Sequence, residues 1–316
     1  MDKKMKRIQF HRYGGPAEMR LEEYQLPDLA DDEIRVSVKA ASINPVDWKI
    51  RQGAMKFMTG RKFPRAMGQD FSGVVEGIGR GVKRLKVGDE VFGSTPVKTS
   101  GSFAETLITK EALAVAKPAA LTHEEAATLP VAATTAWIAL VHKAQLKAGQ
   151  SVFINGAYGA VGQSATQIAK AIGATVVGRV RAESMSAAKA IGADAVLDYR
   201  QSLPGNLMGT FDVVFDTHGS LPANDERRLA KRGGVILDIS PSPTKMMRVV
   251  LSRSRHFVMG KQDEATLREV AGLASKGKLK LSVGRVVRLS EAIDLIRELE
   301  AGRRINGKGL IAIETA

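Results

Sequence analysis

The chain has no cysteine among its 316 residues. Disulfide bonds, thiolate zinc sites, iron–sulfur clusters and a cysteine nucleophile are therefore excluded. A secreted protein built on disulfide bonds is excluded for the same reason. Aromatic residues are also scarce, at 5% of the chain. This scarcity argues against a stacking platform for single-stranded nucleic acid, which needs aromatic side chains beside its basic groups.

Long apolar runs are absent, and acidic residues are in deficit. No apolar run approaches the roughly 18 residues of a membrane-spanning helix. The N-terminal sequence MDKKMKRIQF is basic but has no apolar signal core, so we expect a cytoplasmic protein without a membrane span. With 47 Lys and Arg against 33 Asp and Glu, the net charge is +14. That charge suits anionic ligands, nucleic acid or an anionic membrane surface but identifies none of them.

The most informative feature that is present is a glycine loop. The apolar run 151–155 precedes glycines at 156, 159 and 162, and a helical apolar pattern and the β-branched run 174–177 follow. This order predicts a strand–loop–helix–strand unit whose first turn lets backbone N–H groups approach a pyrophosphate. Ala157 stands where the usual dinucleotide pattern has a glycine. A βαβ unit that binds no nucleotide is the alternative.

The end of the second strand of this unit indicates which cofactor is preferred. Enzymes that use NAD normally place a carboxylate there for the ribose 2′-OH. This chain has Arg179 and Arg181, and no carboxylate before Glu183. An arginine binds a 2′-phosphate through charge-assisted hydrogen bonds, which favours NADPH. The alternative is two solvated arginines on a basic protein.

The pattern along the chain changes near residue 122. Residues 5–125 contain short strands separated by glycine turns, which predicts a β-rich, barrel-like domain. Thr122 and Glu125 have capping-box spacing, and strands alternate with helices from there to about residue 240, as in a parallel α/β sheet. We expect helices at 267–275 and 290–301, and strands at 5–10, 33–42, 72–78, 90–93, 152–155, 175–177, 195–198, 212–215, 235–239 and 309–313.

A series of short motifs carries a resemblance to a known family. They are NPVDWK from residue 44, GQDFSGVV from 68, VGDEVFG from 87, TTAW from 134, the glycine loop, GADAVLDY from 192 and FDVVFD from 211. In this order they resemble the medium-chain dehydrogenase/reductase superfamily, in its zinc-free, quinone oxidoreductase-like branch. The resemblance implies an α/β fold with a β-rich, GroES-like catalytic domain (residues 1–123 and 258–316) and a Rossmann cofactor-binding domain (residues 124–257).

The resemblance also implies a function and a set of cofactor-binding residues. The function is hydride transfer from NADPH to a quinone or an α,β-unsaturated carbonyl compound, and the resemblance also implies a homodimer. Thr134 would lie near the nicotinamide, and Arg179, Arg181 and Tyr199 would surround the 2′-phosphate. His218 could reach the nicotinamide ribose. The pyrophosphate would be lined by Gly156, Ala157, Tyr158, Gly159, Ala160, Val161 and Gly162. The alternatives are a helix cap for Thr134, a half-buried strand-end aromatic for Tyr199 and a surface loop residue for His218.

The resemblance gives no metal site and no clear proton donor. Asn44 and Gln69 stand where zinc-dependent relatives carry Cys and His, and amide side chains do not make the usual tetrahedral zinc site. Met55 stands where some enoyl-thioester reductases of the superfamily have a tyrosine. Asn44 and Asp47 are candidates to orient substrate or ribose, or they hold the turn before Trp48.

Two basic segments lie outside the family pattern. Residues 49–65 contain six Lys or Arg and no acid, and residues 227–261 contain nine with only Asp238. The first is expected to edge the substrate cleft; a solvated face is the alternative for both. The strongly basic charge of the chain keeps open a second function, a non-catalytic NADPH-binding protein that binds nucleic acid or another anionic partner.

Overall fold

The computed structural model describes residues 5–240, 245, 247, 249, 252, 254–260 and 262–313. The chain divides into two compact units. The first comprises Met1–Val131, Gln262–Ser275 and Lys280–Ala316, and the second Ala132–Lys261 and Lys276–Leu279. The predicted domain boundaries, after residues 123 and 257, precede those of the units by a few residues. Among the described residues, no helix has both the length and the apolar character needed to cross a bilayer.

The first unit is built on a seven-stranded sheet. Its central strand β3 (Glu33–Ser42) pairs with β5, β7 and β16, and its β-branched residues Ile34, Val36 and Val38 are fully buried. This burial explains why so long an apolar strand forms here. The sheet order is β15-β16-β3-β5-β6-β8, with β7 on β3. The other strands are β5 (Asp70–Ile78), β6 (Glu90–Ser94), β7 (Thr106–Lys110), β8 (Ala114–Ala116), β15 (Val283–Arg288) and β16 (Lys308–Ala312).

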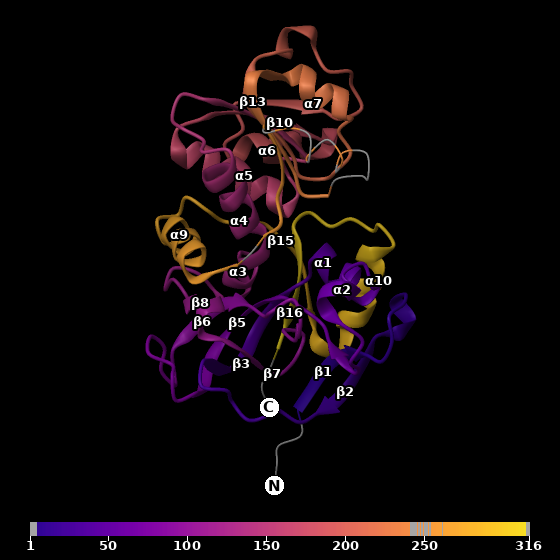
Figure 1. Cartoon of the computed structure of the whole chain (residues 1–316), viewed down its shortest axis with the longest axis vertical. Helices are drawn as coiled ribbons and strands as arrows, with labels where there is room; N and C mark the ends of the chain where they lie inside the picture. Colours follow the sequence, from indigo (N-terminus) through magenta and orange to yellow (C-terminus); the bar gives the residue numbers. More distant parts are fainter. Residues whose placement is uncertain are drawn as a thin grey trace. The chain divides into compact units, whose positions relative to one another are not determined.

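A small antiparallel sheet and several helices complete the first unit (Figure 1). The sheet consists of β2 (Arg20–Tyr24), β1 (Met5–Phe10) and β4 (Arg65–Ala66), in that order. The α-helices are α1 (Pro45–Arg51), α2 (Lys56–Thr59), α3 (His123–Ala127), α9 (Glu264–Ser275) and α10 (Ala292–Glu300), and the 3₁₀ turns are η1 (Pro16–Glu18), η2 (Glu111–Leu113) and η6 (Leu289–Glu291). Helix α4 (Pro130–Trp137) leads from this unit into the second.

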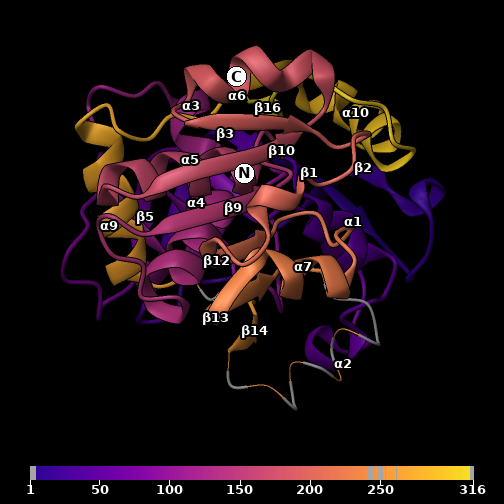
Figure 2. The same cartoon turned by 90° about the horizontal axis from the view of Figure 1, so that it is seen from above.

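The second unit is a six-stranded parallel sheet with helices (Figure 2). Its order is β11-β10-β9-β12-β13-β14, and every pair is parallel. The strands are β9 (Ser151–Asn155), β10 (Thr175–Val180), β11 (Ala195–Asp198), β12 (Phe211–Asp216), β13 (Ala230–Asp238) and β14 (Arg255–Phe257). The helical segments are η3 (Ile138–Lys143, a π-helix), α5 (Ala160–Ile172), η4 (Ala182–Ser184), α6 (Met185–Ala190), η5 (Gly205–Leu207) and α7 (Ala223–Leu229).

The strand order of this sheet fixes where a ligand can bind. From β9 the chain proceeds to β10 and β11 on one side, whereas β12, β13 and β14 lie on the other. The order reverses between β9 and β12, and ligands of such sheets bind beyond the carboxyl ends of the strands at this point. Asn155 and Asp216 end these two strands. The doubly wound, dinucleotide-type sheet expected from the sequence is confirmed.

The predicted strands and helices are present, with shifts at their ends. The largest shift is in β13, which begins at Ala230 rather than at residue 235. The reason is that α7 ends at Leu229 and the next residue already pairs with Phe211 of β12, before a register irregularity. The predicted capping box is confirmed: Glu125 N donates to Thr122 Oγ1 (3.2 Å), and Thr122 N donates to a Glu125 carboxylate oxygen (3.1 Å).

Candidate functional site

The glycine loop forms the tight turn from β9 into α5. Gly156 has φ +82°, which favours glycine, and its N–H donates to Arg179 O at 2.8 Å. A Cβ on Gly162 would lie 2.1 Å from Gly156 O, so only glycine lets the helix approach the loop this closely. Helix α5 begins after Gly159 with no side-chain cap and no acid in its first turn. The first N–H groups of a helix lack intrahelical partners, so this end attracts an anion.

The departure at Ala157 is explained by its packing. Its side chain is fully buried, and a Cβ on Gly178 of β10 would lie 2.9 Å from the Ala157 methyl. The glycine missing from the usual position of the loop is thus matched by a glycine in the neighbouring strand. Tyr158, Gly159, Ala160 and Val161 lie in the same turn, and all but Ala157 and Gly162 are at least partly exposed. The predicted pyrophosphate residues therefore form one continuous turn.

A basic cluster lies at the carboxyl ends of β10 and β11. Arg179 Nη2 donates to Tyr199 O (2.7 Å) and Gln201 O (3.3 Å), while its Nε is buried without a hydrogen-bond partner among the described residues. The guanidinium groups of Arg181 and Arg200 lie 5.9 and 5.8 Å from the centre of the Tyr199 ring. The structure therefore groups the three predicted residues. It adds Arg200, which the sequence analysis missed although it directly follows the predicted Tyr199.

The loop after β12 is held by a buried carboxylate. Asp216 accepts backbone N–H bonds from His218 (3.1 Å), Gly219 (2.9 Å) and Leu221 (2.9 Å). Asn155 at the end of β9 donates to the same carboxylate at 2.9 Å. The His218 side chain is exposed at the switch point of the sheet. Asp216 thus shapes the loop that presents His218.

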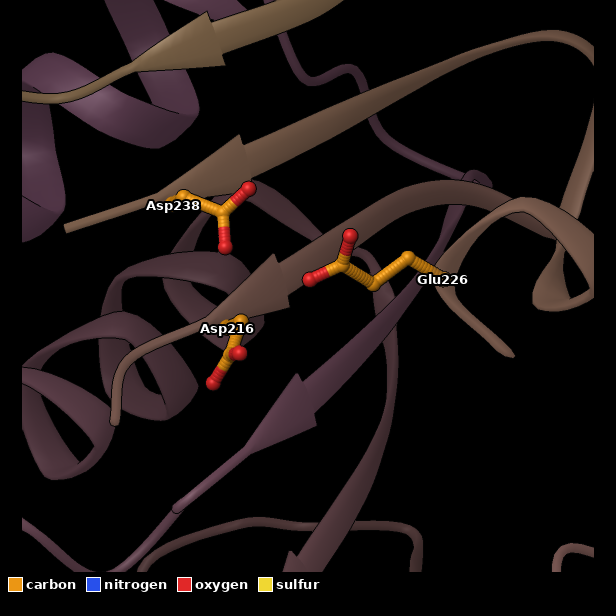
Figure 3. A group of neighbouring side chains, drawn as sticks. All are labelled: Asp216, Glu226 and Asp238. Atoms are coloured by element: carbon orange, nitrogen blue, oxygen red, sulfur yellow. The ribbon is translucent and has the colours of Figure 1, made fainter. Parts of the chain in front are cut away.

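Asp216 also belongs to a buried acidic cluster with Glu226 and Asp238 (Figure 3). One oxygen from each carboxylate lies within 4.8 Å of the others, a spacing that could hold a metal ion. Two buried cations already occupy the cluster. Lys245 Nζ donates to Asp216 (2.9 Å), Asp238 (3.0 Å) and Glu226, and Arg255 Nη1 donates to Glu226 and Asp238 (3.0 Å). These ion pairs satisfy the carboxylates, so the cluster does not act as a metal site.

The pKa values of Glu226 and Asp216 in this cluster are shifted in opposite directions. Burial raises the pKa of Glu226, against the hydrogen bonds from Lys245 and Arg255. Burial opposes ionisation of Asp216 too, but hydrogen bonds from Asn155 and Lys245 lower its pKa below the ordinary value. The expectation that 227–261 could be a solvated face is wrong for Lys245 and Arg255, because both pair with buried acids. Arg248, Arg253 and Lys261 of this segment lie outside the described residues.

Thr134 lies inside helix α4 and is fully buried. The alternative of a helix N-cap is therefore wrong, since four helical residues precede it. Its prediction as a neighbour of the nicotinamide stands on the resemblance.

In the first unit, Asn44 belongs to a buried network around Lys308. Lys308 Nζ donates to Asn44 Oδ1 (2.8 Å) and Asp70 Oδ2 (3.0 Å). Asn44 Nδ2 also donates to Asp70 Oδ2 (2.8 Å). Asn44, Asp70 and Lys308 are each at most 5% exposed. Both polar atoms of the Asn44 side chain are used within the protein, which favours the structural reading of this residue.

Asp47 sits beside this network, in the first turn of α1. Its Oδ2 accepts the N–H of Asn44 at 2.7 Å, and its side chain is 2% exposed. Burial raises the pKa of Asp47 well above its usual value, and the nearby charge of Asp70 adds to this. Asp47 therefore holds the turn before Trp48 as a carboxyl group that resists ionisation.

The residues at the zinc positions of the family do not fit a zinc ion. The amide of Asn44 lies against the Lys308 ammonium, a positive charge that would repel a metal cation. Gln69 turns elsewhere: its Nε2 donates to Ser100 Oγ at 2.9 Å. Without cysteine in the chain, these amides offer no tetrahedral N/S ligand set.

Only part of the basic segment 49–65 is on the surface. Arg51 is fully buried, and its Nη2 pairs with Glu300 at 2.6 Å. Arg65 is 8% exposed and donates to the carbonyl oxygens of Thr59 (2.7 Å) and Lys62 (3.3 Å). For these two residues the expectation of a basic cleft edge is wrong, because they bind the protein itself. The exposed members are Lys49, Lys56, Arg61 and Lys62.

Comparison with known sequences identifies two domain types. Residues 30–119 match the alcohol dehydrogenase GroES-like domain, and residues 191–311 match the domain described as zinc-binding dehydrogenase. The first match covers most strands of the sheet in the first unit. The second includes the strands β11 to β14 of the second unit and returns to β15 and β16.

Similar curated proteins are quinone and alkenal oxidoreductases. A chloroplastic quinone-oxidoreductase homolog of Spinacia oleracea is 36% identical over 255 residues, 78% of each chain. A chloroplast envelope quinone oxidoreductase homolog of Arabidopsis thaliana is 32% identical over 309 residues, 92% of this chain and 94% of the relative. An NADPH-dependent alkenal/one oxidoreductase of A. thaliana is 34% identical over 251 residues, 77% of this chain and 64% of the relative.

Solved structures give the same result. The quinone oxidoreductase of Coxiella burnetii has a TM-score of 0.87 and 28% identity, with 99% of this chain and 100% of that chain covered. The Escherichia coli quinone oxidoreductase complexed with NADPH has a TM-score of 0.83 and 26% identity, with 97% and 99% covered. The similarity therefore extends over nearly the whole chain.

Proposed function

Because the chain belongs to the medium-chain dehydrogenase/reductase superfamily, in its quinone oxidoreductase branch, we propose that it reduces quinones or α,β-unsaturated carbonyl compounds with NADPH and without a metal ion. The observation that carries the proposal is the basic cluster of Arg179, Arg181 and Arg200 around Tyr199. It stands where an NAD enzyme has a carboxylate. Similarity to an NADPH-dependent alkenal/one oxidoreductase and to an NADPH-bound quinone oxidoreductase supports the same cofactor and substrate classes.

The residues of the second unit fit this cofactor. The buried Nε of Arg179 has no partner among the described residues, and a phosphate oxygen is the acceptor that such a donor needs. Residues 156–162 and the uncapped start of α5 would hold the pyrophosphate. Thr134 and His218 would face the nicotinamide and its ribose. When bound, NADPH supplies the hydride from its nicotinamide ring.

The first unit contributes an organised scaffold near the substrate rather than an acid. We assign Asn44 and Asp47 a positioning role, since their polar atoms hold the start of α1 and the contact with Lys308. The proton that completes the reduction would then come from water, which a quinone or enolate product accepts.

A direct test measures NADPH oxidation with a panel of small quinones and enones. We expect activity with NADPH to exceed activity with NADH. Replacing Arg179 and Arg200 together by Ala removes charge-assisted contacts that are worth about 1.5–3 kcal/mol each. NADPH affinity should fall about a hundredfold or more, and NADH affinity should stay nearly unchanged. Arg232→Ala, an exposed arginine elsewhere in the same unit, is the control. Equal affinity for the two cofactors would reject the assignment.

We expect the protein to form a homodimer through an edge of the six-stranded sheet. Analytical ultracentrifugation of the full chain tests this expectation.

We expect a cytoplasmic location from the sequence, although two relatives carry chloroplastic names. Cell fractionation tests this location. The charge of +14 keeps open a second candidate function, a non-catalytic NADPH-binding protein with a nucleic acid or another anionic partner. Absence of turnover with every acceptor would favour this candidate.

A further inference from the structure

The loop 56–62 presents apolar side chains to solvent beside a group of cations. On the one-turn helix α2, Phe57 is 80% exposed and Met58 40% exposed. The flanking residues Lys56, Arg61 and Lys62 are exposed, and none of them forms an ion pair within the described part of the chain. No acid occurs between residues 48 and 69. We call Lys56, Phe57, Met58, Arg61 and Lys62 the basic–apolar tip.

The base of this loop is fixed, so the exposure of the tip is built into the fold. Thr59 is buried, and its hydroxyl lies 2.7 Å from Tyr13 Oη. The buried Arg65 donates to Thr59 O, and Phe63 packs edge-on against the rings of Tyr13 (5.1 Å) and Phe10 (5.9 Å). The segment therefore packs the partly buried Phe63 against the core, and the conformation that it holds leaves Phe57 exposed.

We propose that the basic–apolar tip docks this protein on anionic lipid surfaces, with Phe57 and Met58 entering the interface and Lys56, Arg61 and Lys62 facing the lipid phosphates and carboxylates. A peripheral anchor of this kind combines basic residues with a few large apolar side chains. Burying the exposed Phe57 side chain in the lipid interface gives a hydrophobic free energy that the folded chain in water does not gain. The protein's net charge of +14 adds long-range attraction to a negative surface.

A lipid surface fits the tip better than a nucleic acid does. A platform for single strands stacks successive bases on several aromatic rings. The tip offers one exposed ring, and its neighbour Met58 is aliphatic. Lipid binding by the basic–apolar tip does not depend on NADPH or on turnover.

Vesicle flotation with the full chain tests the proposal. Vesicles of phosphatidylcholine with phosphatidylserine should carry the protein at low salt, and vesicles of phosphatidylcholine alone should not. Lys56→Gln, Arg61→Gln and Lys62→Gln together should weaken binding about a hundredfold, since each surface cation contributes about fivefold. Phe57→Ser with Met58→Ser should weaken it about tenfold or more. Thermal melting of every variant checks that the fold is kept.

A matched control exists in the turn after β5. Arg80, Lys83 and Lys86 are exposed cations there, and Val87 is an exposed apolar residue. Replacing the three cations by Gln removes the same charge as the tip variant. This control should bind anionic vesicles nearly as well as the wild-type chain. Equal loss in both variants would show attraction by net charge alone and would overturn the assignment to the tip.

Insertion itself can be measured because the chain has no cysteine. Phe57→Cys carries a single polarity-sensitive fluorophore, and Val87→Cys carries the same label as the control. Anionic vesicles should shift the emission of the label at 57 to the blue and leave the label at 87 unchanged. A label at 57 that stays in water while the protein floats would overturn the proposal. So would binding of single-stranded RNA, sensitive to Phe57→Ser, without binding of vesicles.

Discussion

At the scale of single residues, the first unit depends on a cation that the fold has removed from water. Lys308 of β16 is 5% exposed and contacts Asp70 and Asn44, which lie more than 200 positions earlier in the chain. Two buried charges are stable only if their contacts are well made. Lys308 thus joins the last strand of the sheet to the segment that begins α1.

Lys308→Met should destabilise the protein by about 3–5 kcal/mol, because it leaves the Asp70 carboxylate buried without its cation. Urea denaturation measures the change. Asp70→Asn in the same chain should restore part of the loss, since the remaining group is then neutral. A double variant no more stable than Lys308→Met would show that the charge pair is not the cause.

The raised pKa of Asp47 makes the free energy of unfolding depend on pH. The unfolded chain releases the proton of this group near pH 3.9, the ordinary value for aspartate. Because burial raises the pKa of Asp47 in the folded protein, the folded state binds more protons between the two pKa values. The free energy of unfolding contributed by this group therefore falls as the pH rises through that window.

Asp47→Asn removes this contribution and keeps an oxygen for the Asn44 N–H. The variant should gain stability relative to the wild-type chain as the pH rises above about 4, measured by urea denaturation. Asp28→Asn, at an exposed aspartate, is the control substitution. Parallel pH profiles for Asp47→Asn and the wild-type chain would contradict the prediction.

At the scale of elements, the β9–α5 turn depends on the absence of one side chain. A Cβ on Gly162 would meet Gly156 O at 2.1 Å, and a backbone atom cannot move aside without moving the turn. Gly162→Ala should lower the melting temperature and weaken NADPH binding, measured by thermal denaturation and calorimetry. Gly205→Ala, where nothing lies within 4 Å, is the matched control and should change neither.

Local patterns predicted the elements but not their long-range contacts. Alternating or continuous β-branched residues located β3 and β9, and the glycine spacing located the turn into α5. Nothing near Lys245 or Arg255 indicated burial, because their partners Asp216, Glu226 and Asp238 meet them only when the sheet is assembled. Arg51 was misjudged for the same reason, since Glu300 lies 249 residues away. The sequence did contain a signal for Arg200, because this residue directly follows the predicted Tyr199.

At the scale of the whole molecule, the structure predicts metal-independent activity. The positions of the family's zinc ligands hold Asn44 and Gln69, and the ammonium of Lys308 adjoins the first of them. Dialysis of the untagged protein against a chelator should change neither turnover nor melting temperature. Stoichiometric zinc by elemental analysis, with activity lost on its removal, would contradict this.

The cluster of three carboxylates and two cations in the second unit also has an evolutionary consequence. Loss of Lys245 or Arg255 alone would leave a buried carboxylate without its partner, at a cost of about 3–5 kcal/mol. Joint replacement of the set by apolar residues of similar volume would cost little. Joint replacement of all five residues therefore preserves the stability of the protein, whereas replacement of one of them alone lowers it. Across descendants of a common ancestor we expect Asp216, Glu226, Asp238, Lys245 and Arg255 to be inherited or lost as one covarying block.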